Sequence, residues 1–227
     1  MLIERTITRN SDGSLLFENR YKHDELGRFL TSEWIVPGAS AGPTTRRIYD
    51  GNHHLVVLLG TEPNNTLMYV QVSSHDRGGR LLSRTAYDGA GLLLGRVEYE
   101  WGDDGGATAK AYDSNHSLQG QFRLRRTTGS LFDIADAVGG AKDATPGPTS
   151  ILHRYAGKRL ESTEMLFPPG QRASKRTMIY ERTGGLLIRM RTLDEPTGTI
   201  TVLELQWTDG ESVVDPEEAF LIDCLQQ

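Results

Sequence analysis

The sequence predicts an all-β fold: consecutive antiparallel β-hairpins that form a strongly curved sheet or a partly closed barrel, followed by a short C-terminal helix. Three observations lead to this prediction. Short runs of alternating apolar and polar residues recur, acidic turn residues separate them, and no long helical pattern competes. Since strongly twisted sheets of more than ~10 strands curl or split, so many hairpins should not stay flat. We treat residues 1–227 as a single domain.

A short turn motif repeats through the chain: an aromatic residue or histidine, an acidic residue, then glycine and leucine. Clear copies begin at Tyr49, His75, Tyr87 and Tyr112, weaker ones at His23 and Tyr180, and degenerate forms are Asp12-Gly13, residues 103–106 and Asp209-Gly210. Glycine accepts a positive φ without steric cost, and aspartate caps turns by accepting backbone hydrogen bonds. We therefore expect tight hairpin turns in which the glycine next to the acid has the positive φ. Such turns explain why 25 of 227 residues are glycine, against a usual share of ~7%.

Between the turns, residues alternate with the period of two that half-buried strands require. Residues 96–101 place their three apolar side chains on one face and Arg96, Glu98 and Glu100 on the other. Residues 121–125, 187–191 and 201–207 alternate in the same way. We therefore expect strands with one buried face and one face in water.

Two segments depart from this pattern. Residues 130–138 suit a short helix, and residues 139–148 are a loop that marks a candidate internal break. Near the end, Asp215 is suited to a helix N-cap, Pro216 to the first helical position, and the acids that follow to the positive end of the helix dipole. We expect this helix to continue to Leu225 and to cover a sheet edge or plug an open end.

The copies that begin at Tyr49, His75, Tyr87 and Tyr112 resemble YD repeats, the hairpin units of the RHS-repeat family, whose pattern is Tyr-Asp-x-x-Gly-x-Leu. The similarity is strongest from 72 to 118 and extends loosely over 4–125 and 150–210. Histidine replaces tyrosine in the copies at 23 and 75, and the copy at 112 lacks the glycine. The resemblance implies antiparallel sheets that curl into shells or barrels, which in large members enclose toxin domains or stand on cell surfaces. This chain has no recognisable toxin domain or secretion signal, so only the hairpin sheet carries over.

Composition and charge exclude several classes of protein. The net charge of −5 argues against a nucleic-acid partner. The longest clean apolar run, Leu55 to Leu59, is far below the ~20 residues of a membrane-spanning helix, and no signal peptide is evident. The single cysteine excludes a disulfide framework or a cysteine-rich zinc site, and His53-His54 has no third ligand at metal spacing. We therefore expect a cytoplasmic protein with no membrane partner, no metal and no cofactor.

A curved sheet has a concave face, and six large aromatic side chains are candidates to line it and bind a ligand there: Tyr99, Trp101, Trp34, Tyr180, Trp207 and Phe122. The alternative is that these side chains simply form the core. An apolar pocket with a few polar groups is a ligand site only if the sheet leaves space inside.

Glu98, Glu100 and His75 are the candidates for acid–base catalysis. A glutamate on a desolvated cavity floor would have a raised pKa and could act as a general acid or base. The alternative interpretation is that the two glutamates form cross-strand ion pairs on a solvent face, and that His75 replaces the tyrosine of the repeat.

Two functions follow from these observations. The first is a non-enzymatic binding or interaction module whose concave face holds a small molecule, a peptide or a partner subunit; exposed sheet edges would also allow a homodimer. The second is a small cofactor-independent enzyme, of isomerase, cyclase or hydrolase type, with an acid–base site in the sheet interior. The sequence favours the first.

Overall fold

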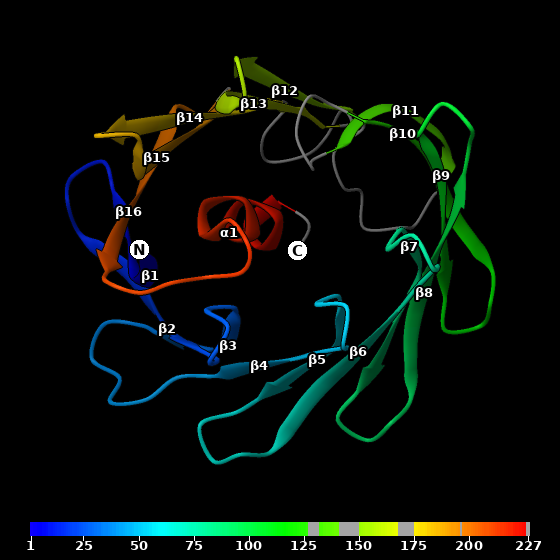
Figure 1. Cartoon of the computed structure of the whole chain (residues 1–227), viewed down its shortest axis with the longest axis horizontal. Coiled ribbons are helices and arrows are strands. Elements are labelled where there is room, and N and C mark those ends of the chain that lie inside the picture. The colour runs from blue at the N-terminus through cyan, green and yellow to red at the C-terminus, as the bar shows by residue number, and fades with distance from the viewer. Residues whose placement is uncertain (127–131, 141–149, 168–174, 196, 226–227) are drawn as a thin grey trace.

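The computed structural model describes residues 1–126, 132–140, 150–167, 175–195 and 197–225. Within these ranges, all strands belong to one antiparallel sheet that closes into a barrel, and one short helix, α1, lies inside the ring (Figure 1). The predicted fold class of consecutive antiparallel hairpins in a strongly curved sheet with a C-terminal helix is confirmed.

The strands and the helix follow the chain in simple order. The first half of the barrel contains β1 (Leu2–Asn10), β2 (Leu15–His23), β3 (Phe29–Ile35), β4 (Thr44–Tyr49), β5 (Leu55–Thr61), β6 (Leu67–His75), β7 (Leu81–Asp88) and β8 (Leu93–Trp101). The second half contains β9 (Ala107–Asp113), β10 (Leu118–Arg126), β11 (Phe132–Gly140), β12 (Ser150–Ala156), β13 (Arg159–Leu166), β14 (Lys175–Thr183), β15 (Leu186–Glu195) and β16 (Thr199–Thr208), and α1 is Pro216–Leu225.

Each strand pairs with its neighbours in the sequence, and the ring closes because β1 also pairs with β16, from Leu2 opposite Thr208 to Asn10 opposite Thr201. The shortest ladder joins β11 to β12 through one residue pair. The exposed sheet edges expected from the sequence are therefore absent at β1 and β16, whereas β11 and β12 are joined only where Ile134 lies opposite Ile151. Closure satisfies the backbone groups that a terminal strand would leave open.

Residues 130–138 are not the predicted helix, because β11 begins at Phe132. Its register with β10 places Asp136 opposite Arg123 and Asp133 opposite Arg125. Pairing with the neighbouring ladder outweighs the local preference for a helix, since unpaired backbone groups are costly. Residues 130–131, and all but the first two residues of the predicted break at 139–148, lie outside the described residues.

Eight described turns share one backbone geometry, shown here by the turn from Asp76 to Arg80. The amide of Asp76 donates to the carbonyl of Arg80, and the amide of Gly79 donates to the carbonyl of Asp76. Asp76 Oδ1 also accepts from the amides of Gly78 (2.8 Å) and Arg80 (2.9 Å). The eight turns begin at Asn10, Asp24, Asp50, Glu62, Asp76, Asp88, Gly102 and Asp113.

The predicted turn chemistry needs one correction. The positive φ falls on the fourth residue of the turn, for example Gly79 (82°) and Gly91 (85°). This residue follows an acid directly in two turns, at Gly13 and Gly105, as predicted, but Gly51 and Gly89, which follow the first acid of their turns, do not have a positive φ. A positive φ on the fourth residue is the geometry of a longer hairpin loop, in which a type I turn is followed by one left-handed residue. The tighter two-residue turn is found between β14 and β15, where Gly184 and Gly185 both have positive φ.

The degenerate motif Asp209-Gly210 is not a hairpin turn, because no strand follows it. β16 ends at Thr208, and the chain turns inward toward α1. Within the described ranges, no helix has the length and apolarity needed to cross a membrane.

α1 begins as predicted and is fixed to the barrel wall. Asp215 Oδ1 accepts hydrogen bonds from the amides of Glu217 (2.9 Å) and Glu218 (3.2 Å). Glu217 forms an ion pair with Arg182 of β14 and accepts a hydrogen bond from the amide of Leu187 of β15 (3.2 Å). The helix therefore plugs the interior, in agreement with the second of its two expected roles.

The buried core surrounds α1 on one side of the ring. Phe220 and Leu221 of α1 belong to one apolar cluster with Ile3 of β1, Leu187 of β15 and Leu205 of β16. Across the interior from this cluster, the sheet and the helix are separated by a cavity.

Candidate functional site

The candidate site is a cavity of about 570 Å³ between α1 and the inner face of β3–β7. Its described lining combines apolar, aromatic and charged side chains from the sheet, its turns and the helix. The lining residues are Gly27, Arg28, Phe29, Arg47, Tyr49, His53, Leu55, Leu58, Tyr69, Gln71, Arg84, Val214, Asp215, Pro216, Glu218, Ala219 and Ile222.

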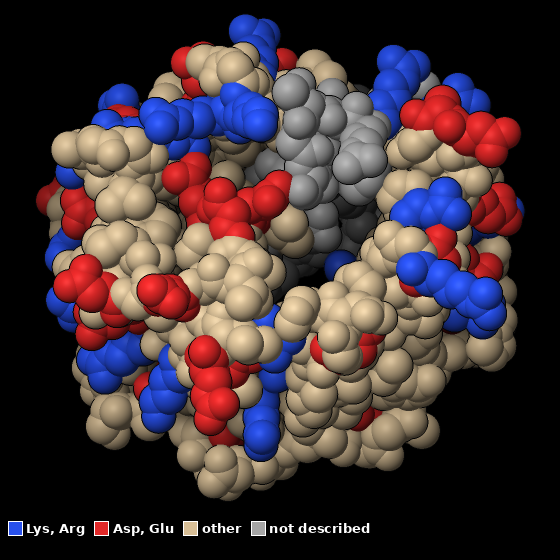
Figure 2. All heavy atoms as spheres, in the orientation of Figure 1, with Lys and Arg blue, Asp and Glu red and all other residues tan. Residues whose placement is uncertain are grey.

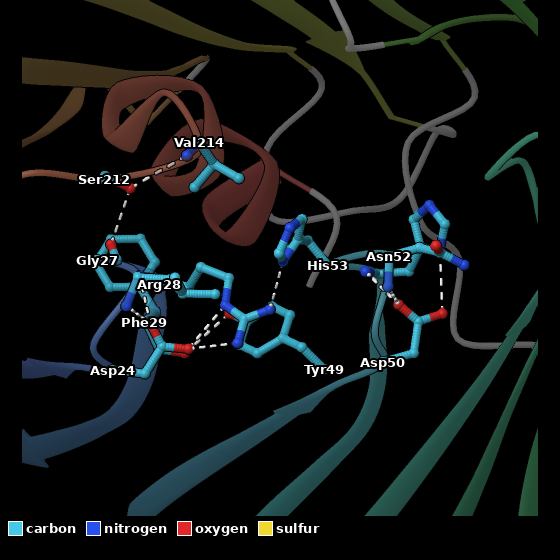
Figure 3. A network of polar contacts seen from close by, with 12 residues as sticks. Asp24, Gly27, Arg28, Phe29, Tyr49, Asp50, Asn52, His53, Ser212 and Val214 are labelled. Carbon is cyan, nitrogen blue, oxygen red and sulfur yellow. Dashed lines mark hydrogen bonds and ion pairs between the residues drawn. The ribbon is translucent and has the colours of Figure 1, made fainter.

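The segment that leads into α1 forms part of the cavity mouth by binding the turn between β2 and β3 (Figure 3). The Val213 amide donates to the carbonyl of Leu26 (2.9 Å), and the Ser212 hydroxyl donates to the carbonyl of Gly27 (3.0 Å). A Cβ at Gly27 would lie 2.1 Å from the carbonyl oxygen of Glu211. Glycine is therefore needed at position 27 both for its positive φ of 75° and for this close approach.

Arg28 links this turn to the turn between β4 and β5. Its guanidinium contacts Asp24 Oδ2 (2.6 and 2.7 Å), lies 4.4 Å from the centre of the Tyr49 ring, and donates to His53 Nδ1 at 3.0 Å. Burial pushes the pKa of Asp24 upward, but hydrogen bonds from Arg28 and from the amides of Arg28 and Leu26 outweigh it and lower that pKa.

The sheet wall of the cavity presents two further arginines. Arg47 of β4 is only 3% exposed, and its Nη1 donates to Ser32 Oγ at 3.2 Å. Arg84 of β7 lies opposite Ser73 of β6 in the ladder. Between the two arginines lies Gln71 of β6, two residues before Ser73 and therefore on the same face.

The Tyr69 side chain crosses the neighbouring strand on this wall. A Cβ at Gly60 of β5 would lie 2.1 Å from Tyr69 Cε1, so the ring occupies the space that a side chain at position 60 would take. The Tyr69 hydroxyl is 3.4 Å from Thr45 Oγ1. Gly60 therefore allows Tyr69 to lie flat along the cavity wall.

The helix wall is apolar with an acidic beginning. Val214, Ala219 and Ile222 line the cavity, together with Asp215 and Glu218. Figure 2 shows acidic side chains gathered at the centre of this end of the molecule, where α1 lies in Figure 1, next to a hollow. Asp215 is occupied as the N-cap of α1.

Two stacked histidines involve His54, the residue that follows the cavity-lining His53. The rings of His54 and His75 stack with their centres 4.8 Å apart, and His54 Nδ1 donates to Asp50 Oδ2 at 3.1 Å. Burial, and to a smaller extent the charge of His54, lowers the pKa of His75. His75 thus packs at the end of β6, outside the described lining of the cavity.

Glu98 and Glu100 lie on the outer face of β8. Glu100 accepts a hydrogen bond from Lys110 of β9 at 2.5 Å, and Glu98 is 3.2 Å from Arg96. Both carboxylates are substantially exposed. The structure therefore does not bring them to the face that contains His75 and Tyr99, and cross-strand pairing describes Glu100 well.

Trp101 and Trp207 tie consecutive hairpins together. Each donates its indole N–H, at 2.8 Å, to the carbonyl of a residue twenty positions earlier: Leu81 for Trp101 and Leu187 for Trp207. The Tyr49 hydroxyl makes the same link to the carbonyl of Phe29 at 2.8 Å. An aromatic residue near the end of one strand thus binds the first or second residue of the strand before it.

The other predicted aromatic residues lie at separate places in the barrel. Tyr180 is buried in the core beside α1, and its hydroxyl lies 2.9 Å from Thr163 Oγ1. Burial raises the pKa of Tyr99. Phe122 lies opposite the buried Ala109, whereas Trp34 is 45% exposed and packs edge-to-face on Phe17.

None of the nine residues predicted from the sequence belongs to the described lining of the cavity. The residues that sequence reasoning missed are the arginines at 28, 47 and 84. A usable signal exists for Arg47, because it alternates in phase with Tyr49, whose ring faces inward beside the turn. Among the described residues, no group of three or more His, Cys, Asp or Glu side chains is close enough to hold a metal ion.

No family model matches the chain, and no curated protein is similar to it. Among solved structures, a porin-like protein from Bacteroides uniformis ATCC 8492 is similar with a TM-score of 0.42 and 10% identity, over 90% of this chain and 98% of that one. A porin-like protein from Bacteroides vulgatus ATCC 8482 gives a TM-score of 0.39 and 8% identity, over 92% and 99%. Similarity at this level identifies neither a family nor a function.

Proposed function

We propose that this chain is a non-enzymatic binding protein that holds a small molecule in the cavity between β3–β7 and α1. The observation that carries the proposal is the cavity itself, about 570 Å³ in volume and lined by apolar surface with several convergent polar groups. Sites for small molecules have volumes of roughly 300–1,000 Å³ and this kind of lining.

The chemistry of the described lining suits recognition more than catalysis. The three arginines only donate hydrogen bonds and stay charged at all ordinary pH values. The lining also contains two acidic residues, Asp215 and Glu218. The carboxylate of Asp215 is already engaged as the N-cap of α1. The glutamates expected to act as acid and base, Glu98 and Glu100, point away from the interior.

The repeated turn supports a further part of the proposal, that the hairpins are copies of one ancestral unit similar to a YD repeat. The five turns that begin with aspartate have the same backbone and side-chain hydrogen bonds, from Asp24 to Asp113. A cytoplasmic location, a peptide or protein partner and a homodimer stay predictions.

A titration with N-phenyl-1-naphthylamine, a neutral fluorescent molecule, tests the binding proposal. We expect one molecule to bind per chain with enhanced, blue-shifted emission. Ala219→Trp on the helix wall and Gln71→Trp on the sheet wall should each weaken binding at least tenfold, because they fill the cavity from opposite sides. Ala90→Trp, in an exposed turn, is the control and should bind normally. If both cavity variants fold, as judged by circular dichroism, and bind as the wild type does, the proposed site is wrong.

A further inference from the structure

We infer that the ligand of this cavity is an amphipathic anion, whose charged group is bound by Arg47 and Arg84 of the sheet wall and whose apolar body lies against α1. The inference rests on the proposed function and adds the chemical class of the ligand to it.

The charges on the two walls of the cavity have opposite signs. Arg28, Arg47 and Arg84 all come from the sheet and its turns, whereas Asp215 and Glu218 both come from the helix segment. A guanidinium binds carboxylate, sulfonate or phosphate through a planar pair of N–H groups. An anionic group on a ligand would therefore turn toward the sheet wall and away from α1.

Arg47 is placed for this role by its strand. Its neighbour across the ladder is Leu58 of β5, followed on the next strand by Gln71, so its side chain leaves the sheet in the middle of the wall. Its guanidinium carbon lies 5.9 Å from the centre of the Phe29 ring. Its charge is thus held in a mostly buried position, where water screens it little.

Arg84 brings a second positive charge to the far side of Gln71. The charge of Arg84 affects two nearby side chains. Burial is the main cause of the raised pKa of Tyr99, and the positive charge of Arg84 acts in the opposite direction. Burial is also the main cause of the lowered pKa of His75, and Arg84 adds to it. Arg84 also lines the cavity, so its positive charge belongs to the sheet wall.

The apolar part of the lining indicates where the body of the ligand lies. Phe29, Leu55 and Leu58 on the sheet, and Ala219 and Ile222 on the helix, form facing apolar surfaces. A free inorganic anion would leave these surfaces in contact with water, whereas an aromatic or aliphatic body would cover them. The combination favours a ligand with both parts.

Two fluorescent molecules with the same body test this inference. 8-Anilino-1-naphthalenesulfonate carries a sulfonate, and N-phenyl-1-naphthylamine does not. We expect the wild type to bind the sulfonate at least tenfold more tightly than the neutral molecule. Arg47→Met and Arg84→Met should each reduce this ratio several-fold while changing the affinity for the neutral molecule less than twofold. Arg123→Met, on an exposed position of β10, should leave the ratio unchanged.

Glu218→Gln provides a change of opposite sign. Removing this carboxylate from the helix wall should strengthen binding of the sulfonate and leave binding of the neutral molecule unchanged. Urea denaturation identifies any variant that fails to fold, and Arg84→Met and Glu218→Gln keep the test valid if the buried Arg47 cannot be replaced. If the neutral molecule binds in the cavity but no folded variant changes the ratio of the two affinities, the inference of an anionic ligand is wrong and the binding proposal stands. If neither molecule is sensitive to the tryptophan variants, the binding proposal itself fails.

Discussion

At the scale of single residues, the eight shared turns each contain one residue in the left-handed region, three positions after the first residue. This residue is glycine in five turns, and His53, Asn65 and His116 take the same conformation in the others, with φ between 62° and 68°. A side chain in this region costs about 1 kcal/mol or more. The regular occurrence of glycine at this position is thus a response to backbone geometry.

Gly91 and Gly51 form a matched pair that tests the effect of a positive φ without steric crowding. Neither has an atom within 4 Å of an added Cβ, but only Gly91 has a positive φ, of 85°. We expect Gly91→Ala to lower the free energy of unfolding by about 1 kcal/mol. Gly51→Ala should be neutral or slightly stabilising in the same urea denaturation experiment. Equal effects at the two positions would show that φ does not explain the glycine pattern.

The sequence located the turns better than the site at this scale. Acidic residues and glycines announce turns because their effect is local: an aspartate side chain reaches amides two and four residues away. The role of Trp101 or Arg47 depends on partners twenty or more residues distant, or on another strand. The sequence pattern gives the phase of such a residue but not what it faces.

At the scale of elements, α1 shows the same contrast between local features, which the sequence predicts, and contacts with distant residues, which it does not. Its beginning was predicted from Asp215 and Pro216, because capping is local. Its place inside the barrel depends on Glu217, which forms an ion pair with Arg182 and accepts a hydrogen bond from the Leu187 amide. Both partners precede Glu217 by thirty residues or more.

The Glu217 contacts predict a clear difference between two adjacent acids of α1. Glu217→Gln should lower the free energy of unfolding by about 1–3 kcal/mol, because it removes a charged hydrogen-bond partner from a mostly buried arginine. Glu218→Gln makes the same change of charge one residue later and should cost less than about 0.5 kcal/mol. Chemical denaturation of both variants measures this, and a similar loss in both would contradict the anchoring role of Glu217.

β11 shows where local preference was overridden. The sequence of residues 130–138 suited a short helix, but Phe132–Gly140 continue the ladder of β10. β11 pairs with β10 along its whole length, although with β12 at one position only, and this pairing satisfies the backbone groups on the β10 side. The need for this pairing follows from the topology of the sheet, and the sequence of residues 130–138 does not indicate it.

At the scale of the whole molecule, the interior is divided between a packed core and a cavity. The core gathers around Phe220, Ile3 and Leu187, all fully buried. The cavity lies on the other side of α1, against β3–β7. The helix thus does two things at once: it completes the core on one face and bounds the candidate site with another.

Phe220 tests how much the barrel depends on its helix. We expect Phe220→Ala to lower the free energy of unfolding by about 3–5 kcal/mol, since the side chain is 0% exposed. Leu94→Ala, on the outer face and 54% exposed, should cost less than about 1 kcal/mol. Urea denaturation distinguishes these results, and a small effect at Phe220 would mean that the barrel is stable without the helix packed inside it.

The sequence by itself determined the all-β class, most turn positions, the alternating faces of the strands and the beginning of α1. Each of these depends on neighbours within a few residues, where periodicity and turn chemistry act directly. The tertiary structure alone decided that β1 pairs with β16, that β11 is a strand, that α1 lies inside, and that Arg28, Arg47 and Arg84 share a cavity. These features depend on contacts between distant segments, and an arginine on a strand has the same local pattern whether it faces water or a ligand.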